Sequence, residues 1–104
     1  MVGSRDQGKW REQCAFGGIL RSTARGTLPY RASDNIPFGQ EWNREDGTDR
    51  SFSDWARVLE GIRLSTTFEI PYATTDGKVI NVRSARAFGG DLTSALRRYL
   101  EVGA

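Results

Sequence analysis

A long polar segment in the middle of the chain, residues 33–50, restricts the fold more than any other feature. It reads SDNIPFGQEWNREDGTDR. Most connections in a compact domain contain about 4–6 residues, so a structureless connection of this length separates the elements before it from those after it. We therefore expect two hairpin–helix units, one on each side of a long acidic loop.

The clearest pattern follows this loop, where apolar and polar residues alternate over residues 67–72. The alternation predicts a β-strand, and a second strand is expected over residues 78–88. A two-residue turn would place the apolar side chains of the two strands on opposite faces of the hairpin. A three-residue loop at residues 75–77 pairs Tyr72 with Ile80 and brings these side chains to one face. The pattern therefore favours the longer loop.

Two helices are predicted in the second half of the chain. The first begins with a capping box at Ser51 and Asp54, and the second has Asp91 as its N-cap, after two glycines. Apolar residues recur in both segments at helical spacing. The stripes expected to be buried are Phe52, Trp55, Val58, Leu59 and Ile62 in the first helix, and Leu92, Ala95, Leu96, Tyr99 and Leu100 in the second.

The first third of the chain is interpreted as a second hairpin. Residues 14–23 and 27–32 are predicted to be strands that turn at Arg25-Gly26, and residues 1–9 are expected to be flexible. The element order is then ββ, long loop, α, ββ, α. This order predicts a single α+β domain over residues 1–104, with an antiparallel sheet of about four strands and two helices packed on one face.

The composition excludes several kinds of catalytic and metal site. There is no histidine, which removes the usual general base near neutral pH and histidine-based zinc sites. Cys14 is the one cysteine and lies in an apolar stretch, so we expect a buried thiol, no intramolecular disulfide and a cytoplasmic location. Residues 42–53 lack carboxylates that a calcium-binding EF-hand loop requires. We predict a protein that is not an enzyme and that uses no metal or cofactor.

Apolar runs are also short. None approaches the ~18 residues that a membrane-spanning helix needs, so no membrane association is expected.

Charge is unevenly distributed along the chain, with +4 over residues 1–33, −4 over residues 34–60 and +2 over residues 61–104. Of the fifteen cations thirteen are arginine, a side chain suited to bidentate contacts with carboxylates or phosphates.

The acidic loop is predicted to bind a protein. It combines acids with two large aromatic side chains, and an aromatic anchor surrounded by charge is typical of protein interfaces. The predicted function is that of a small inhibitor or adaptor, of a kind found in phages and other mobile elements, which docks on a larger protein with a basic surface. The alternative for the two aromatics is that they fold back and cover the core. The predicted binding residues are Phe38, Glu41, Trp42, Glu45, Asp46 and Asp49.

The second interpretation is a nucleic-acid-binding domain. Arg21, Arg25 and Arg31 lie on or near the first predicted hairpin, and Tyr30 is close to them in the sequence. Such a hairpin would contact phosphates through the arginines and stack a base on the tyrosine. The acidic loop would repel a polyanion, so this interpretation ranks second.

Overall fold

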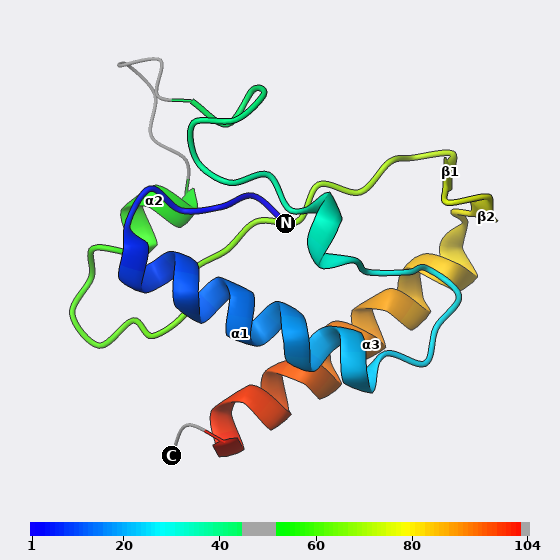
Figure 1. Cartoon of the computed structure of the whole chain (residues 1–104). Coiled ribbons are helices and arrows are strands. Elements are labelled where there is room, and N and C mark those ends of the chain that lie inside the picture. The colour runs from blue at the N-terminus through cyan, green and yellow to red at the C-terminus, as the bar shows by residue number, and fades with distance from the viewer. Residues whose placement is uncertain (45–51, 103–104) are drawn as a thin grey trace. The chain divides into compact units, whose positions relative to one another are not determined.

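The computed structural model describes residues 1–44 and 52–102 (Figure 1). Its elements differ from the predicted α+β sandwich. The sheet found in this part of the chain has two strands of two residues each, so the prediction of about four strands with two helices on one face is wrong. The elements are α1 (Gln7–Thr23), a 3-10 turn (Ala32–Asp34), α2 (Phe52–Ala56), β1 (Thr74–Thr75), β2 (Lys78–Val79) and α3 (Val82–Val102).

Contacts along the chain define two compact units. Unit 1 comprises Met1–Cys14 and Ser33–Glu69, and unit 2 comprises Ala15–Ala32 and Ile70–Ala104. Helix α1 therefore begins in unit 1 and ends in unit 2. Hydrogen bonds of buried polar side chains hold unit 1 together, whereas unit 2 is held mainly by packed apolar side chains.

Helix α1 occupies the segment predicted as a strand over residues 14–23. Asp6 is its N-cap, because the Asp6 carboxylate accepts a hydrogen bond from the Lys9 backbone N–H at 2.9 Å. The glycines that suggested a bend in a strand lie inside this helix. A Cβ atom on Gly17 would lie 2.2 Å from the Tyr30 hydroxyl oxygen, so Gly17 allows Tyr30 to pack against the helix. Residues 27–32, the other predicted strand, form no strand.

Helix α3 begins well before the predicted N-cap, Asp91. Asn81 is the true cap, since its side-chain oxygen accepts from the Ser84 N–H and the Ser84 hydroxyl accepts from the Asn81 N–H, both at 2.9 Å. This reciprocal pair is a capping box in which serine replaces the usual glutamate. Most of the predicted strand over residues 78–88 is therefore helical. The buried residues of α3 recur every three or four positions and are Ser84, Phe88, Asp91, Ala95 and Tyr99.

The hairpin between the two long helices has the shorter of the two turns considered. Thr74 pairs with Val79, and the φ angles of Asp76 and Gly77 are 51° and 75°, as in a two-residue type I′ turn. The three-residue loop predicted at residues 75–77 is wrong. That prediction assumed one buried face, but Tyr72 and Val79 are 95% and 62% exposed, so burial does not select the register.

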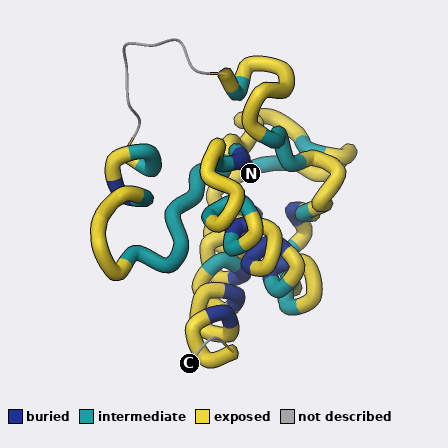
Figure 2. The backbone as a smooth tube through the Cα atoms, turned by 60° about the vertical axis from the view of Figure 1, so that its left-hand side comes forward, coloured by how far each residue is buried: buried dark blue, intermediate teal, exposed yellow. Residues whose placement is uncertain are grey.

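The apolar core that the structure shows lies mainly in unit 2. The rings of Phe16 and Tyr99 meet edge to face, with centroids 5.9 Å apart and planes at 87°. Leu20 and Ala95 are fully buried beside them in the same unit. Figure 2 shows buried positions recurring along the long helices, whereas the hairpin is exposed or half-buried. In the predicted stripe of the last helix, Ala95 and Tyr99 are buried, Leu92 is half-buried, and Leu96 and Leu100 are exposed.

Asp91 connects the end of α1 to α3. Its buried carboxylate accepts hydrogen bonds from the backbone N–H groups of Arg25, at 2.9 Å, and Gly26, at 3.0 Å. Asp91 therefore lies in the middle of α3 and accepts hydrogen bonds from backbone N–H groups of the turn after α1. The prediction that Asp91 is the N-cap of the last helix is wrong.

The two adjacent glycines of α1 give a matched test of this packing. Gly17→Ala places a methyl group against Tyr30 and should lower the free energy of unfolding by about 1–3 kcal/mol. Gly18→Ala meets no atom within 4 Å and should raise it by about 0.5–1 kcal/mol, because alanine favours the helix. Urea unfolding followed by circular dichroism measures both changes. Equal effects of the two substitutions would contradict the packing of Tyr30 on α1.

Candidate protein-binding surface

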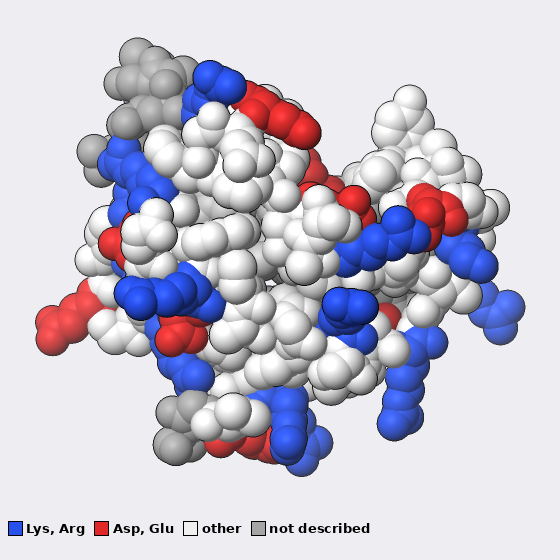
Figure 3. Space-filling view, viewed as in Figure 1, with Lys and Arg blue, Asp and Glu red and all other residues white. Residues whose placement is uncertain are grey.

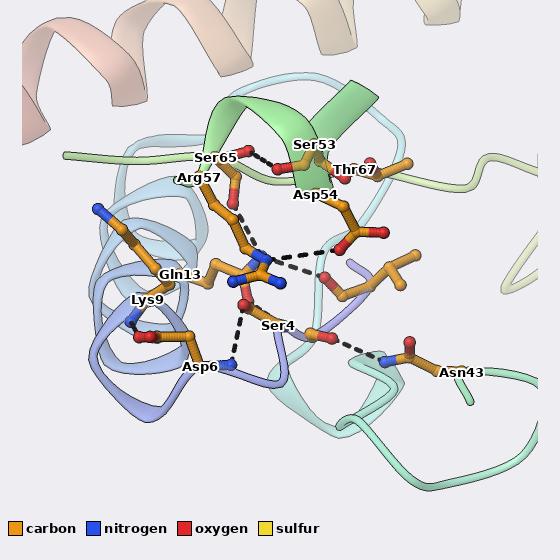
Figure 4. A network of polar contacts seen from close by, with 12 residues as sticks. Ser4, Asp6, Lys9, Gln13, Asn43, Ser53, Asp54, Arg57, Ser65 and Thr67 are labelled. Atoms are coloured by element: carbon orange, nitrogen blue, oxygen red, sulfur yellow. Dashed lines mark hydrogen bonds and ion pairs between the residues drawn. The ribbon is translucent and has the colours of Figure 1, made fainter. Parts of the chain in front are cut away.

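Unit 1 is organised around the side chain of Gln13, which is 2% exposed (Figure 4). Its carbonyl oxygen accepts from the Ser4 N–H at 2.8 Å. Its amide nitrogen donates to the backbone carbonyl oxygens of Val2, at 3.2 Å, and Ser65, at 3.0 Å. One side chain on α1 thus joins the N-terminal segment to the segment that follows α2.

Helix α2 is attached to that second segment through its polar side. The Ser65 hydroxyl donates to the Ser53 carbonyl oxygen at 2.8 Å, and the Thr67 hydroxyl donates to the Ser53 hydroxyl at 3.2 Å. Figure 4 shows these three side chains together beside α2. Ala56 is the buried residue of the helix. The Ser53 side of α2 therefore faces the protein.

The apolar side chains of α2 and of the turn after it are exposed. Phe52, Trp55, Val58 and Leu59 are 79%, 54%, 60% and 40% exposed, and we call these four residues the α2 apolar surface. The prediction that this stripe is buried is wrong for all four, while Ile62 is half-buried. The reason lies in Ser53 and its two hydroxyl partners, which hold the opposite side of the helix. The rings of Phe52 and Trp55 contact each other, with centroids 5.5 Å apart.

The described part of the predicted acidic loop also presents aromatic side chains. Phe38 and Trp42 are 41% and 56% exposed, so they do not cover the core. The Asn43 amide nitrogen fixes this stretch, because it donates to the carbonyl oxygens of Gly3, at 2.8 Å, and Ile36, at 2.7 Å. Glu41 is exposed, with a φ angle of 51°.

The predicted binding site includes three residues of the segment between residue 44 and α2. Glu45, Asp46 and Asp49 lie outside the described residues. The candidate site therefore consists of the loop over residues 37–44 and the α2 apolar surface, both in unit 1.

The residues of the alternative nucleic-acid site all lie in unit 2, where the predicted hairpin is absent. Arg21 and Arg25 are exposed at the end of α1 and in the turn after it. Arg31 forms an ion pair with Asp76, and Tyr30 packs against Gly17. Among the described residues, Arg21 and Arg25 are the two arginines of this group that form no ion pair with an acid.

Cys14 is exposed, so the prediction of a buried thiol is wrong, and partial burial raises the pKa of that thiol. Within residues 1–44 and 52–102, no three Cys, Asp or Glu side chains lie together where they could hold a metal ion. No helix in those ranges combines the length and the apolar character needed to cross a bilayer.

Figure 3 shows one face of the molecule, on which both positively and negatively charged side chains occur.

Comparisons with protein-family models, with curated proteins and with solved structures returned no match.

The hydrogen bonds of Asn43 give a test of how the 37–44 loop is held. Asn43→Ala should lower the free energy of unfolding by about 1–2 kcal/mol, because the Gly3 carbonyl loses its side-chain donor. The Ile36 carbonyl keeps the Gly3 N–H as a partner, at 2.9 Å, which limits the loss. Gln40→Ala, on the exposed side of the same loop, is the control and should change stability by less than about 0.5 kcal/mol. Urea unfolding checks both values, and an unchanged stability of Asn43→Ala would contradict this account of the loop.

Proposed function

We propose that the chain is a non-enzymatic protein-binding module, an inhibitor or adaptor, that docks through the α2 apolar surface and the 37–44 loop of unit 1. One observation carries the proposal. The apolar stripe over α2 and the turn after it has the spacing of a core helix, yet its four side chains are exposed while Ser53 of α2 is hydrogen-bonded to the segment that follows.

Such an arrangement favours binding for a thermodynamic reason. Apolar surface gains free energy when it leaves water, about 25 cal/mol per Å². Soluble monomers rarely expose large contiguous apolar patches, and those that do commonly use them to bind other proteins. An amphipathic helix that lays its apolar face into a groove of its partner is a recurrent mode of recognition. Phe52 and Trp55 supply aromatic anchors, which are typical of the side chains that dominate binding energy.

The charge of unit 1 supports a partner with a basic surface. Its residue ranges contain ten acids and seven cations, a net charge of −3. Glu41 and Glu60 are exposed on the loop and after α2. Acids around an apolar centre accelerate encounter with a basic partner and disfavour acidic ones. The lone cysteine favours a reducing compartment, so we place this binding in the cytoplasm.

The test uses two triple variants of the tagged full-length chain as baits in a lysate of the native host. Phe52→Ser, Trp55→Ser and Val58→Ser remove the centre of the α2 apolar surface. Ile70→Ser, Tyr72→Ser and Val79→Ser remove three exposed apolar side chains of unit 2 and serve as the matched control. Quantitative mass spectrometry compares the proteins captured by the wild type and by each variant.

The proposal predicts that a protein with a basic surface is captured by the wild type and by the unit 2 variant. The α2 variant should retain less than about a tenth of that capture, since each lost anchor contributes about 1 kcal/mol or more. Equal capture by both variants would refute the proposal. A wild-type homodimer that the α2 variant dissociates would also contradict it, because the surface would then be occupied by a second copy of the chain.

A further inference from the structure

A second surface, on α3 in unit 2, carries a concentration of positive charge. Arg83, Arg86, Arg97 and Arg98 are all exposed. At 3.6 residues per turn, the first three fall within about 60° of the helix circumference, and Arg98 widens the arc to about 120°. Arg83 and Arg97 are separated by about 21 Å along the helix axis. The four side chains therefore form a stripe along most of α3, which we call the α3 arginine face.

Little negative charge opposes this stripe. The Asp91 carboxylate is buried and bonded to the backbone N–H groups of Arg25 and Gly26. Glu101 is the other acid of α3, and it pairs with Arg97 at 3.1 Å. Among the described residues, Arg83, Arg86 and Arg98 have no acidic partner.

The rest of unit 2 adds to this charge. Its residue ranges contain eight cations and three acids, a net charge of +5, and seven of the eight cations are arginine. The hydrogen bond from the Arg25 N–H to Asp91 places the end of α1 beside the middle of α3. The α3 arginine face thus belongs to a broader basic region of unit 2.

The chemistry of this face indicates a phosphate polyanion. Its intervening residues are small, with Ala87, Gly90 and Ser94 between the arginines. Small side chains let a phosphate backbone approach the helix closely, and none of these three positions between the arginines carries a large apolar side chain that would anchor a peptide. Guanidinium groups bind phosphate oxygens through two parallel hydrogen bonds.

The same face favours a duplex over a single strand. Proteins that bind single strands stack the bases on exposed aromatic rings. The two aromatic residues of α3, Phe88 and Tyr99, are both buried on another side of the helix. An α-helix that carries arginines instead fits the major groove of a DNA duplex, where its guanidinium groups can contact the phosphates on either side.

We propose that α3 binds the phosphate backbone of duplex nucleic acid through the α3 arginine face, with Arg21 and Arg25 as flanking contacts. This binding is independent of the protein-binding surface of unit 1 and goes beyond it. It would make the chain an adaptor with one surface for a protein and one for a nucleic acid.

The test measures the binding of the full chain to a fluorescein-labelled DNA duplex of mixed sequence, about 20 base pairs long, by fluorescence anisotropy at about 50 to 200 mM salt. Two triple variants are compared. R83Q/R86Q/R98Q removes the three α3 arginines without an acidic partner. R5Q/R11Q/R44Q removes three exposed arginines of unit 1 and changes the net charge equally. Circular dichroism confirms that both variants keep the helical content of the wild type.

The proposal predicts that the wild type binds the duplex at the lowest salt and that the α3 variant binds at least about tenfold more weakly. The slope of log affinity against log salt should become less steep by about 2.7, which corresponds to three phosphate contacts. The unit 1 variant should keep the wild-type affinity within about twofold. Absent wild-type binding, equal losses in both variants, or tighter binding to a single strand or to anionic phospholipid vesicles would each overturn the proposal.

Discussion

The position of α2 depends on the buried carboxamide of Gln13. A buried amide must have its hydrogen bonds satisfied, and Gln13 satisfies its own by joining Ser4, Val2 and Ser65. Ser65 in turn holds the backbone of α2 through the Ser53 carbonyl. This series of polar contacts determines which side of α2 faces the protein. The aromatic side chains of the helix are then left in water, where a partner can cover them.

The two units illustrate two ways of holding a short chain together. Unit 2 buries aromatic and aliphatic side chains, with Phe16 against Tyr99 and a carboxylate that closes the turn after α1. In unit 1 the contacts around Gln13 and Asn43 are largely polar. Charge follows the same division, since unit 1 is acidic and unit 2 is basic. The proposed adaptor function relies on this division, because an acidic surface attracts basic partners and a basic surface attracts acidic ones.

Some of this structure could be predicted from the sequence, and the predictions that are wrong have physical causes. A helix that starts near Phe52 follows from the predicted capping box, although α2 ends at Ala56 and not near Ile62 as the stripe predicted. The burial of Ala95 and Tyr99 follows from helical spacing. The strand predicted over residues 14–23 is wrong because Gly17-Gly18 was interpreted as a bulge or bend in a strand. The strand predicted over residues 78–88 is wrong because alternating residues were interpreted as a strand and Gly89-Gly90 as the point before a new helix. In both places a capping residue, Asp6 or Asn81, marks the true start of a helix. Those caps and the spacing of buried residues in α3 were signals that could have identified the helices.

The binding site was harder to predict than the helices. Spacing identifies the apolar stripe of α2 but not the side of the helix that faces the protein. The side of α2 that faces the protein depends on hydrogen bonds from the hydroxyl groups of Ser65 and Thr67 to Ser53. The N-terminal segment that holds Ser65 through Gln13 is distant from all three residues in the sequence. The exposure of Phe38 and Trp42 likewise depends on the contacts of Asn43 with Gly3 and Ile36.

Hydroxyl-radical footprinting of the wild-type chain, read by mass spectrometry, tests the exposure of the α2 apolar surface most directly. The account predicts that Phe52 and Trp55 are oxidised at rates close to those in the urea-unfolded chain. Phe16, Phe88 and Tyr99, which are buried, should be strongly protected in the same sample. Protection of Phe52 and Trp55 to the same degree as Phe16 would show that the stripe is part of the core, and would contradict the account.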